Sequence, residues 1–245
     1  MSNKFLNYKR YDLSHTDAEI LQRGGWLTSD ILQFAFACLC NNDDGSLSHD
    51  RFGFLNPLTI MMLTHGDPET QASLVEDCAM ISKELIFIPL NDADATNKSL
   101  RGTHWRLLVY CKRSSSFHLY DSNSKHSGGS DLGTQANGLV QCLSPFLVGT
   151  TSNSCHKVQE TCPQQENGYD CGMYVVCVVE HLYLTFLSDT NVTLKSPSDA
   201  KDTIQEIVTQ QKVSERRNFL YERATELRNL SLSTTEDRGE KTTTT

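Results

Sequence analysis

A long apolar segment in the last third of the chain constrains the fold more than any other feature. Residues 173–187 are apolar enough to form a helix buried in a protein core. The polar, glycine-bounded run Gln165-Glu166-Asn167-Gly168 precedes this segment and disfavours regular structure. Cys171 therefore lies at or near a helix N-terminus, where unpaired N–H groups and the helix dipole favour a thiolate. A cysteine that only fills space has no need of this position, whereas a nucleophile does.

The length and charge of the chain limit its class. Its 245 residues suffice for one large domain or two small ones with a sizeable core. The composition, 38% hydrophobic and 21% charged, is that of an ordinary globular protein. A formal net charge of −8 argues against a nucleic-acid or anionic-membrane partner. We expect no nucleic acid and no membrane as partner, and we expect a monomer.

The N-terminus and the cysteines bear on location. The first ten residues are polar and lack the apolar core of a secretory signal. The apolar runs at 31–40 and 175–187 are both too short to span a bilayer. Nine cysteines, an odd number without tight regular spacing, indicate reduced thiols rather than a disulfide framework. These features predict a protein of the cytoplasm, the nucleus or both.

Capping residues, prolines and hydrophobic periodicity predict the order of elements. Helices are expected at 31–40, 57–64 and 68–83, strands at 85–90, 104–110 and 117–121, a helix at 132–146, a weak strand at 154–160, and helices at 171–187, 196–211 and 213–230. This order indicates an α+β domain rather than a doubly wound sheet. Residues 231–245 are mostly Ser, Thr, Asp, Glu and Lys, so we expect one domain over 1–230 and a disordered tail over 231–245.

Candidate partners for the Cys171 thiol lie on two neighbouring predicted strands. A thiol that attacks an acyl carbon needs a base to take its proton and a third group to orient that base. His104 begins the first strand, and Asp121 ends the second. Antiparallel pairing would bring these two side chains to one edge of the sheet. A helix that starts at Cys171 and packs on the sheet would complete the group.

Attack on a carbonyl also needs hydrogen-bond donors for the developing oxyanion. The backbone N–H of Cys171 can be one donor, and the side-chain amide of Gln165 or Gln164 can be a second. A glutamine suits this task because its N–H donates without titrating. Loss of one such donor typically costs about 3–4 kcal/mol of transition-state stabilisation.

Each of these residues also has a plain structural explanation. Taken alone, Cys171 would be a buried thiol, His104 a structural histidine, and Asp121 a turn residue at a strand end. Trp105 would be a core aromatic, and Gln165 a loop residue.

A zinc site is a further alternative. Cys155, His156, Cys162 and Cys171 are the candidate ligands, but their spacing lacks the C-x₂-C pair that structural zinc sites use. We therefore expect no metal and no other cofactor.

Three motifs carry a resemblance to a known protease family. Gly102-Thr103-His104-Trp105, Leu119-Tyr120-Asp121-Ser122 and Gln165-x-Asn167-x-Tyr169-Asp170-Cys171-Gly172 resemble the motifs of the Ulp1/sentrin-specific cysteine proteases. Members of that family cleave after the terminal Gly-Gly of ubiquitin-like proteins and share the order His, Asp, Cys. The resemblance covers about residues 11–187 and is greatest for the NEDD8-specific branch. It implies a papain-like cysteine protease fold with a permuted order of catalytic residues.

The resemblance implies a role for each catalytic candidate. Cys171 would be the nucleophile, His104 the general base and then the general acid, and Asp121 the group that orients the imidazole. Gln165 would donate to the oxyanion and is preferred to Gln164, since the family's glutamine lies six positions before the cysteine.

The resemblance also implies a substrate-binding set. Trp105 would cover the Gly-Gly tail in a narrow channel that rejects side chains, and Trp26, Gly102 and Asn167 would complete the contacts with the substrate. One departure from the branch is Thr28-Ser29-Asp30, where an Asn-Asp pair is usual after Trp-Leu. The helix cap is retained there, whereas a substrate contact need not be.

These expectations together predict a peptidase and isopeptidase that acts on a ubiquitin-like protein. NEDD8, as precursor or as conjugate on a lysine, is the first expected substrate and partner. SUMO is the alternative modifier for the same machinery. A module that binds a ubiquitin-like protein without cutting it is an alternative from another class, and an acyltransferase using the same three residues is a third.

Overall fold

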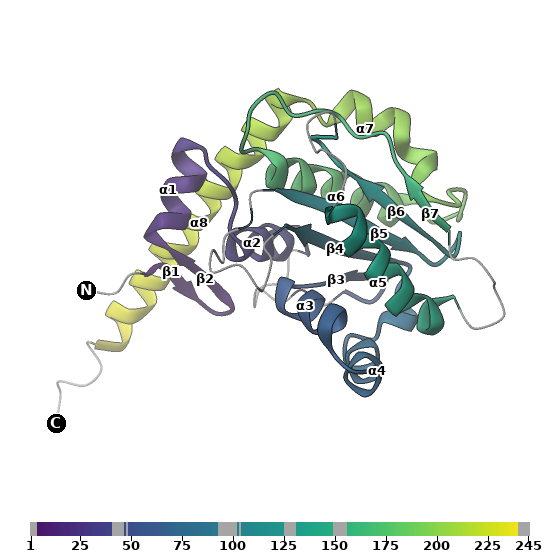
Figure 1. Ribbon diagram of the computed structural model, residues 1–245. Coiled ribbons are helices and arrows are strands. Elements are labelled where there is room, and N and C mark those ends of the chain that lie inside the picture. Colours follow the sequence, from purple (N-terminus) through teal and green to yellow (C-terminus); the bar gives the residue numbers. More distant parts are fainter. Residues whose placement is uncertain are drawn as a thin grey trace.

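A five-stranded mixed sheet forms the centre of the molecule (Figure 1). The computed structural model describes residues 4–40, 47, 49–92, 102, 104–124, 131–148 and 156–239, without the side chains of 131–133 and 234–239. The strands lie in the order β3 (Phe52–Phe54), β4 (Leu85–Asn91), β5 (Trp105–Cys111), β6 (Ser116–Tyr120) and β7 (His156–Gln159). Strand β5 pairs antiparallel with β4 and β6, whereas the outer strands β3 and β7 pair parallel with their neighbours.

Helices cover both faces of the sheet, and each face has its own core. Successive strand residues point to opposite faces, so odd and even positions of β4 and β5 enter different cores. The odd positions pack with α2 (Ser29–Cys40) and α6 (Cys171–Ser188). The even positions pack with α3 (Pro57–His65), α4 (Pro68–Asp77) and α5 (Asp131–Leu147). The three layers confirm the predicted α+β class.

Helix α6 runs through the larger core. It begins at Cys171 and ends at Ser188, so it is longer at both ends than the apolar run at 175–187. By length and composition it could cross a membrane, but 67% of it is buried inside the fold. An apolar surface on all sides is what a central core helix requires.

Capping residues mark two helix starts that the sequence predicts. Asn56 and Asp67 each accept a hydrogen bond from the backbone N–H three residues later, at 2.8 and 2.7 Å. Helix α4 ends at Asp77 rather than near 83. The reason is a left-handed residue, Ala79, with φ of 48°, after which a short 3₁₀ turn, η1 (Met80–Ser82), follows.

Four elements of the N-terminal region were not expected from the sequence. They are β1 (Lys4–Tyr8), β2 (Tyr11–Ser14), α1 (His15–Arg23) and β3. The strands are short and mixed in polarity, which weakens any period-two signal. Helix α1 does carry a signal, because the Ser14 hydroxyl accepts from the N–H of Asp17 at 3.1 Å and the Asp17 carboxylate accepts from the N–H of Ser14 at 2.8 Å. This is a capping box.

The C-terminal region is divided differently from the expectation. The helix predicted over 196–211 is split into η2 (Pro197–Ala200) and α7 (Lys201–Ile207), since Val208 leaves the helical region with ψ of 75° and buries its side chain. Helix α8 (Gln210–Gly239) follows and continues past residue 230, where the sequence placed a disordered tail. A helix already fixed to the core extends readily, because each added residue needs no new nucleus. Residues 240–245 of the predicted tail lie outside the described residues.

Helix α8 packs the C-terminal part of the chain against the N-terminal elements. It lies along α1 and the β1–β2 hairpin and also contacts α6 (Figure 1). The C-terminal part of the chain is therefore packed against the helix that begins at Cys171.

Candidate active site

His104 and Asp121 meet at one edge of the sheet, as the strand pairing predicts. Leu107 of β5 lies opposite Tyr120 of β6, so the residues just outside these two strand ends are neighbours. The Nε2 atom of His104 lies 2.8 Å from Oδ1 of Asp121. Cys171, the first residue of α6, lies close enough to the His104 ring to raise the pKa of the imidazole. Since Nε2 faces the carboxylate, Nδ1 is the ring nitrogen that faces the sulfur.

The three side chains are buried and carry complementary charges. Burial opposes the charge on His104, but hydrogen bonds to Asp121 and Cys171 outweigh burial and raise the pKa of the imidazole to about 9. Burial also acts to raise the pKa of Asp121, but His104, the N–H of Asn123 and Arg106 hold that pKa below its ordinary value. At neutral pH the pair is an imidazolium beside a carboxylate. An imidazolium at a helix N-terminus favours the thiolate form of a neighbouring cysteine.

Arg106 and Asp92 support this pair, and sequence reasoning missed both. The Nε atom of Arg106 lies 2.9 Å from Oδ2 of Asp121. The carboxylate of Asp92 accepts a hydrogen bond from the backbone N–H of His104 at 2.9 Å. Strand periodicity is the signal for Arg106, because residues 104 and 106 point to the same side of a strand. Nothing in the sequence alone singles out Asp92, which follows β4.

The structure separates the two candidate glutamines. Both N–H bonds of the Gln164 amide have acceptors, the carbonyls of Asp121 at 3.0 Å and Cys162 at 2.9 Å. The Gln165 amide donates to the carbonyl of Asn167 at 2.6 Å, and its oxygen accepts from the Ser122 hydroxyl at 2.9 Å. Because a side-chain amide has two N–H bonds, Gln165 keeps one for another acceptor. This accounting favours Gln165 over Gln164 as a donor to an oxyanion.

Asn167 shapes the loop that leads into α6. Its Nδ2 donates to Asp170 at 2.7 Å, and its Oδ1 accepts from the N–H groups of Tyr169 and Asp170 at 3.1 and 2.9 Å. The amide is therefore engaged at both ends within the loop. The structure gives Asn167 a part in positioning Cys171, whereas contact with a substrate stays a prediction.

Two tryptophans hold the segment before α2 against the site. The indole N–H of Trp26 donates to the carbonyl of Gly168 at 2.9 Å, and its ring is 53% exposed. The indole N–H of Trp105 donates to the carbonyl of Leu27 at 2.9 Å, and its ring is only 4% exposed. Trp26 therefore offers an open aromatic surface beside the loop before Cys171, whereas Trp105 is a core residue next to His104.

Glycines at 102 and 172 allow close approach of other groups. A Cβ atom at Gly102 would lie 1.6 Å from Oδ1 of Asn91 and 2.5 Å from Oδ1 of Asp92. A Cβ atom at Gly172 would lie 2.9 Å from Cβ of Leu27. The motif glycines thus keep space for Asp92, which holds His104, and for Leu27, which packs on the first turn of α6.

Cys171 is unlike the other cysteines in its setting. Burial raises the pKa of six other thiols, to about 11 for Cys38, to about 12 for Cys40, Cys162 and Cys177, and upward for Cys78 and Cys142. These thiols are protonated at neutral pH. Within the described residues, no group of three or more His, Cys, Asp or Glu side chains is arranged to hold a metal ion. Cys155, one of the candidate zinc ligands, lies outside the described residues.

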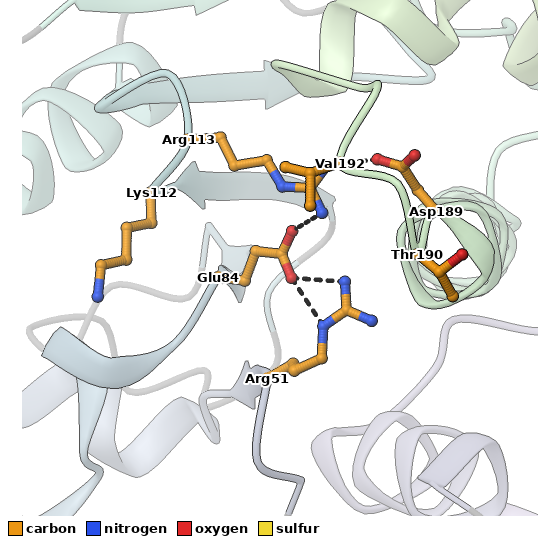
Figure 2. Close-up of a pocket in the computed structure, with 7 residues that line it drawn as sticks. All are labelled: Arg51, Glu84, Lys112, Arg113, Asp189, Thr190 and Val192. Atoms are coloured by element: carbon orange, nitrogen blue, oxygen red, sulfur yellow. Dashed lines mark hydrogen bonds and ion pairs between the residues drawn. The ribbon is translucent and has the colours of Figure 1, made fainter.

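A cavity of about 370 Å³ lies elsewhere, at the other end of α6 (Figure 2). Arg51, Glu84, Lys112 and Arg113 line it together with Asp189, the residue that follows α6. Its charged side chains are paired with one another or with backbone carbonyls. The cavity therefore has no part in the chemistry at Cys171.

A cysteine at a helix N-terminus, next to an imidazole that is oriented by a carboxylate, defines a thiol protease site. The model of the Ulp1 protease family, C-terminal catalytic domain, matches residues 26–216. Sentrin-specific protease 8 of Homo sapiens is 32% identical over 190 residues, 77% of this chain and 85% of the human protein. NEDD8-specific protease 1 of Arabidopsis thaliana is 27% identical over 176 residues, 71% and 73% of the two chains. The chain belongs to the Ulp1 protease family and is a cysteine protease.

A solved structure confirms the fold. The C-terminal Ulp1 protease domain in complex with Smt3, the yeast ortholog of SUMO, has a TM-score of 0.63 and 17% sequence identity to this chain. The match covers 91% of this chain and 87% of that domain. The resemblance to the Ulp1 family that three short motifs carry is therefore confirmed along most of the chain.

Proposed function

We propose that this cysteine protease hydrolyses the bond after the C-terminal Gly-Gly of a ubiquitin-like protein, with NEDD8 as its main substrate. The contact of His104 with both Cys171 and Asp121 carries the proposal for the reaction. The names of two relatives, sentrin-specific protease 8 and NEDD8-specific protease 1, support NEDD8 as the modifier. Both the precursor and a conjugate on a lysine present the same acyl group to the site.

In the first step, the Cys171 thiolate attacks the carbonyl carbon of the terminal glycine. The developing oxyanion accepts hydrogen bonds from the N–H of Cys171 and from the remaining N–H of Gln165. His104 gives its Nδ1 proton to the leaving amine, and the C–N bond breaks to leave a thioester. Asp121 holds the ring through Nε2 and stabilises the positive charge of the imidazolium until this proton is transferred.

In the second step, water attacks the thioester. His104, now neutral, takes a proton from this water, and the thiolate of Cys171 leaves as the bond to sulfur breaks. The products are the free Gly-Gly carboxylate and the regenerated imidazolium–thiolate pair. All groups in this scheme belong to the chain or to water.

The surface beside the nucleophile supports a role in holding a peptide tail. Trp26 is exposed and is fixed by its hydrogen bond to Gly168, so its ring can pack on a substrate without first being ordered. Trp105 lies next to His104 but is buried, and Asn91 and Asp92 fill the space beside Gly102. The exposed ring of Trp26 therefore supports a substrate contact, whereas contacts of the substrate with Trp105, Gly102 and Asn167 stay predictions.

SUMO is the second candidate, because the Ulp1 domain with 0.63 TM-score is in complex with the yeast ortholog of SUMO. A panel of NEDD8, SUMO and ubiquitin, each with a fluorogenic amide at the C-terminus, separates the two. We expect hydrolysis of NEDD8 with the highest kcat/KM and no hydrolysis by Cys171→Ala. A preference for SUMO would replace the modifier but keep the mechanism. Tight binding of a modifier without turnover would show a binding module instead.

A further inference from the structure

Asp170 stands directly before Cys171 but does not cap the helix that it precedes. Aspartate is among the best N-cap residues, since its carboxylate accepts from the first-turn N–H groups. Here the side chain makes no such bond, and the backbone has φ of −85° and ψ of 2° rather than the extended conformation of an ordinary N-cap. The carboxylate is directed away from the start of α6.

Three donors hold the Asp170 carboxylate in this position. Arg217 donates to Oδ1 at 2.7 Å, and Gln210 and Asn167 donate to Oδ2 at 2.8 and 2.7 Å. Both the Asp170 and the Arg217 side chains are more than nine-tenths buried. Burial acts to raise the pKa of Asp170, but these donors hold it below its ordinary value.

Arg217 is fixed by more than its charge. Its guanidinium donates to the carbonyls of Ile20 at 3.0 Å and Gly25 at 3.2 Å, and it lies 5.8 Å from the centre of the Tyr169 ring. It therefore links α8 to the end of α1 and to the residue before Trp26. Arg217 lies one position beyond the region that the family model matches.

The geometry points to Arg217 as a positioning residue for the reaction: it holds the Asp170 carboxylate away from the start of α6. The positive end of the helix dipole and the first-turn N–H groups of Gly172 and Met173 then stay available to negative charge at the thiolate and the oxyanion. The inference rests on the proposed function, because it assigns these N–H groups to the transition state. It also gives helix α8, whose role the sequence left open, a part in the active site.

Loss of Arg217 would allow the Asp170 carboxylate to accept hydrogen bonds from the first-turn N–H groups of α6, as an aspartate before a helix ordinarily does. Asn167 and Gln210 would still donate to the carboxylate, but without the cation a capping bond worth about 1 kcal/mol competes with them for it. A carboxylate in that position would occupy first-turn donors and place a negative charge beside the sulfur. Both effects would weaken thiolate attack without removing any catalytic group.

The first test is Arg217→Met in the full chain. With a fluorogenic NEDD8 amide, we expect kcat to fall by about 10- to 100-fold, less than for complete loss of an oxyanion donor, while KM changes less than about threefold. Alkylation of Cys171 by iodoacetamide at neutral pH, followed by peptide mass spectrometry, should slow as well. A change in KM alone would contradict the inference, since it would mean that Arg217 only holds the segment near Trp26.

The second test removes the carboxylate from the variant. Arg217→Met with Asp170→Ala should recover kcat to within about tenfold of the wild type, since no carboxylate is left to move toward the helix. A double variant that is folded but no more active than Arg217→Met would overturn the inference. If Arg217→Met does not fold, Arg217→Gln carries the same predictions, because it removes the charge but keeps a donor for a backbone carbonyl.

Arg223→Met is the matched control on the same helix. The Arg223 side chain is 39% exposed and pairs only with Glu226 within the described residues. We expect its kcat and alkylation rate to equal those of the wild type. If the wild type hydrolyses no ubiquitin-like substrate, the proposed function fails. The role of Arg217 is then still decided by the alkylation rates of Arg217→Met, of Arg217→Met with Asp170→Ala, and of Arg223→Met.

Discussion

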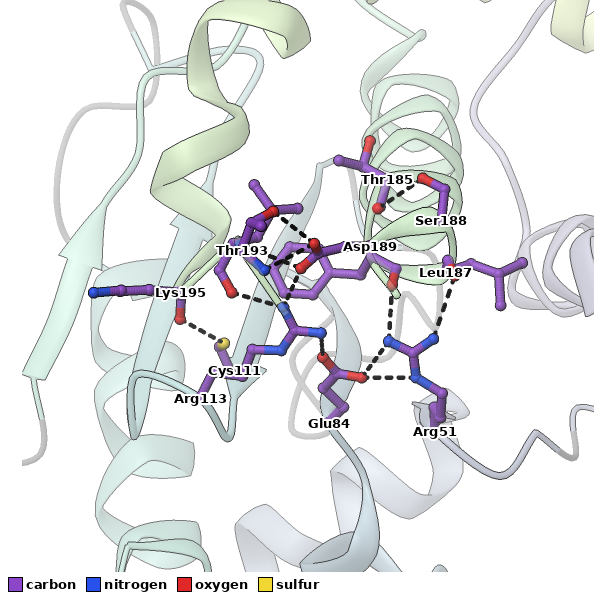
Figure 3. Close-up of polar contacts among 12 residues, drawn as sticks. Arg51, Glu84, Cys111, Arg113, Thr185, Leu187, Ser188, Asp189, Thr193 and Lys195 are labelled. Atoms are coloured by element: carbon purple, nitrogen blue, oxygen red, sulfur yellow. Dashed lines mark hydrogen bonds and ion pairs between the residues drawn. The ribbon is translucent and has the colours of Figure 1, made fainter. Parts of the chain in front are cut away.

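The two ends of helix α6 are built in opposite ways. At its N-terminus no side chain caps the first turn, and the His104 imidazolium lies beside Cys171. At its C-terminus, Arg51 donates to the carbonyls of Phe186 at 2.8 Å and Leu187 at 3.3 Å (Figure 3). A cation is stabilising at the negative end of a helix dipole, whereas at the positive end it needs an anion beside it.

Further ion pairs close the C-terminal end. Glu84 lies between Arg51 and Arg113, and Arg113 also donates to Asp189 at 2.5 Å (Figures 2 and 3). Hydrogen bonds from Thr193, together with Arg113, hold the pKa of Asp189 well below its ordinary value. The network joins the end of α6 to residues that flank β3, β4 and β5.

The C-terminal end of α6 therefore contributes mainly to the stability of the fold, and the N-terminal end contributes mainly to the reactivity of Cys171. At the C-terminal end the Arg51 guanidinium donates to the last carbonyls, and its positive charge is favourable at the negative end of the helix dipole. The N-terminal end keeps N–H groups and positive potential for a charge that appears only on sulfur and on the oxyanion. We therefore expect substitutions at the N-terminal end to change turnover more than stability, and substitutions at the C-terminal end to do the reverse.

The largest expected effect on turnover is that of His104→Ala. Without the imidazole, nothing ionises Cys171 or protonates the leaving amine, so kcat should fall at least about 10³-fold. Asp121 keeps its contacts with Arg106 and Asn123, so the variant should fold, with a melting temperature lowered by loss of the ion pair with His104. Steady-state kinetics and thermal unfolding measure both quantities. A folded variant with more than a tenth of the wild-type kcat would show that His104 is not the base.

The next effect is the pH dependence at the N-terminal end. The pKa of His104, about 9, lies above the ordinary value of 6.5, so its interactions stabilise the fold fully below pH 6.5 and this contribution is lost as pH rises through 9. The proton for the leaving amine is lost over the same range. We expect kcat/KM to fall about tenfold per pH unit above 9. A profile that stays flat to higher pH would contradict the raised pKa.

Asp121 affects how the stability of the fold depends on pH on the acid side. Its pKa is held below 3.8, so its contribution to stability is present above that pH and is lost as pH falls through the lowered pKa. Thermal unfolding as a function of pH should show both losses. Asp121→Asn should reduce the acid-side loss, whereas the parts due to Asp170 and Asp189 should remain.

A smaller effect is expected for Gly172→Ala. The added Cβ would meet Cβ of Leu27 at 2.9 Å, and overpacking of this kind costs about 1–3 kcal/mol. Leu27 also accepts the indole hydrogen bond of Trp105, so its displacement reaches the residue next to His104. We expect kcat to fall about tenfold, because small misplacements of catalytic groups are costly.

Gly138→Ala is the matched control for that substitution. It lies inside α5, and a Cβ there would meet nothing within 4 Å. Alanine in a helix interior stabilises by about 0.5–1 kcal/mol relative to glycine, so unfolding in denaturant should show a gain with no change in kcat. Equal losses of activity in both variants would show that the close approach to Leu27 has no part in positioning Cys171.

The smallest effect on turnover is that of Arg113→Met at the C-terminal end. It leaves Glu84 buried without its second partner, and breaking a buried ion pair costs about 3 kcal/mol. Urea unfolding should show this loss, while kcat at a temperature where the variant is folded equals that of the wild type. A fall in kcat comparable to that of Gly172→Ala would mean that the two ends of α6 are not independent.

The sequence predicts the three catalytic side chains better than the residues that hold them in place. A helix that starts at Cys171 and an antiparallel pair of strands that ends at His104 and Asp121 are local patterns, and together they fix the convergence of the three side chains. The lateral contact of Arg106 with Asp121 follows from strand alternation. The bond between Arg217 and Asp170 spans 47 positions and depends on how α8 packs, which no local pattern specifies.

The fold shows the same limit. The central strands and α6 have strong apolar patterns and were predicted within a few residues. Strand β1 buries only Leu6 fully, so its pattern is weak, and its pairing with β2 depends on contact with α8. The break at Val208 is set by the core that receives its side chain, and this is a tertiary effect that overrides helix propensity.

Covalent capture at Cys171 tests the account most directly. NEDD8 with an electrophile at its C-terminus should form a single adduct with the wild type at Cys171, and mass spectrometry should find none with Cys171→Ala. With His104→Ala, capture should slow by at least about 10²-fold, because the imidazole no longer ionises the sulfur. Capture of folded His104→Ala at the wild-type rate, or an adduct at a different cysteine, would contradict the account.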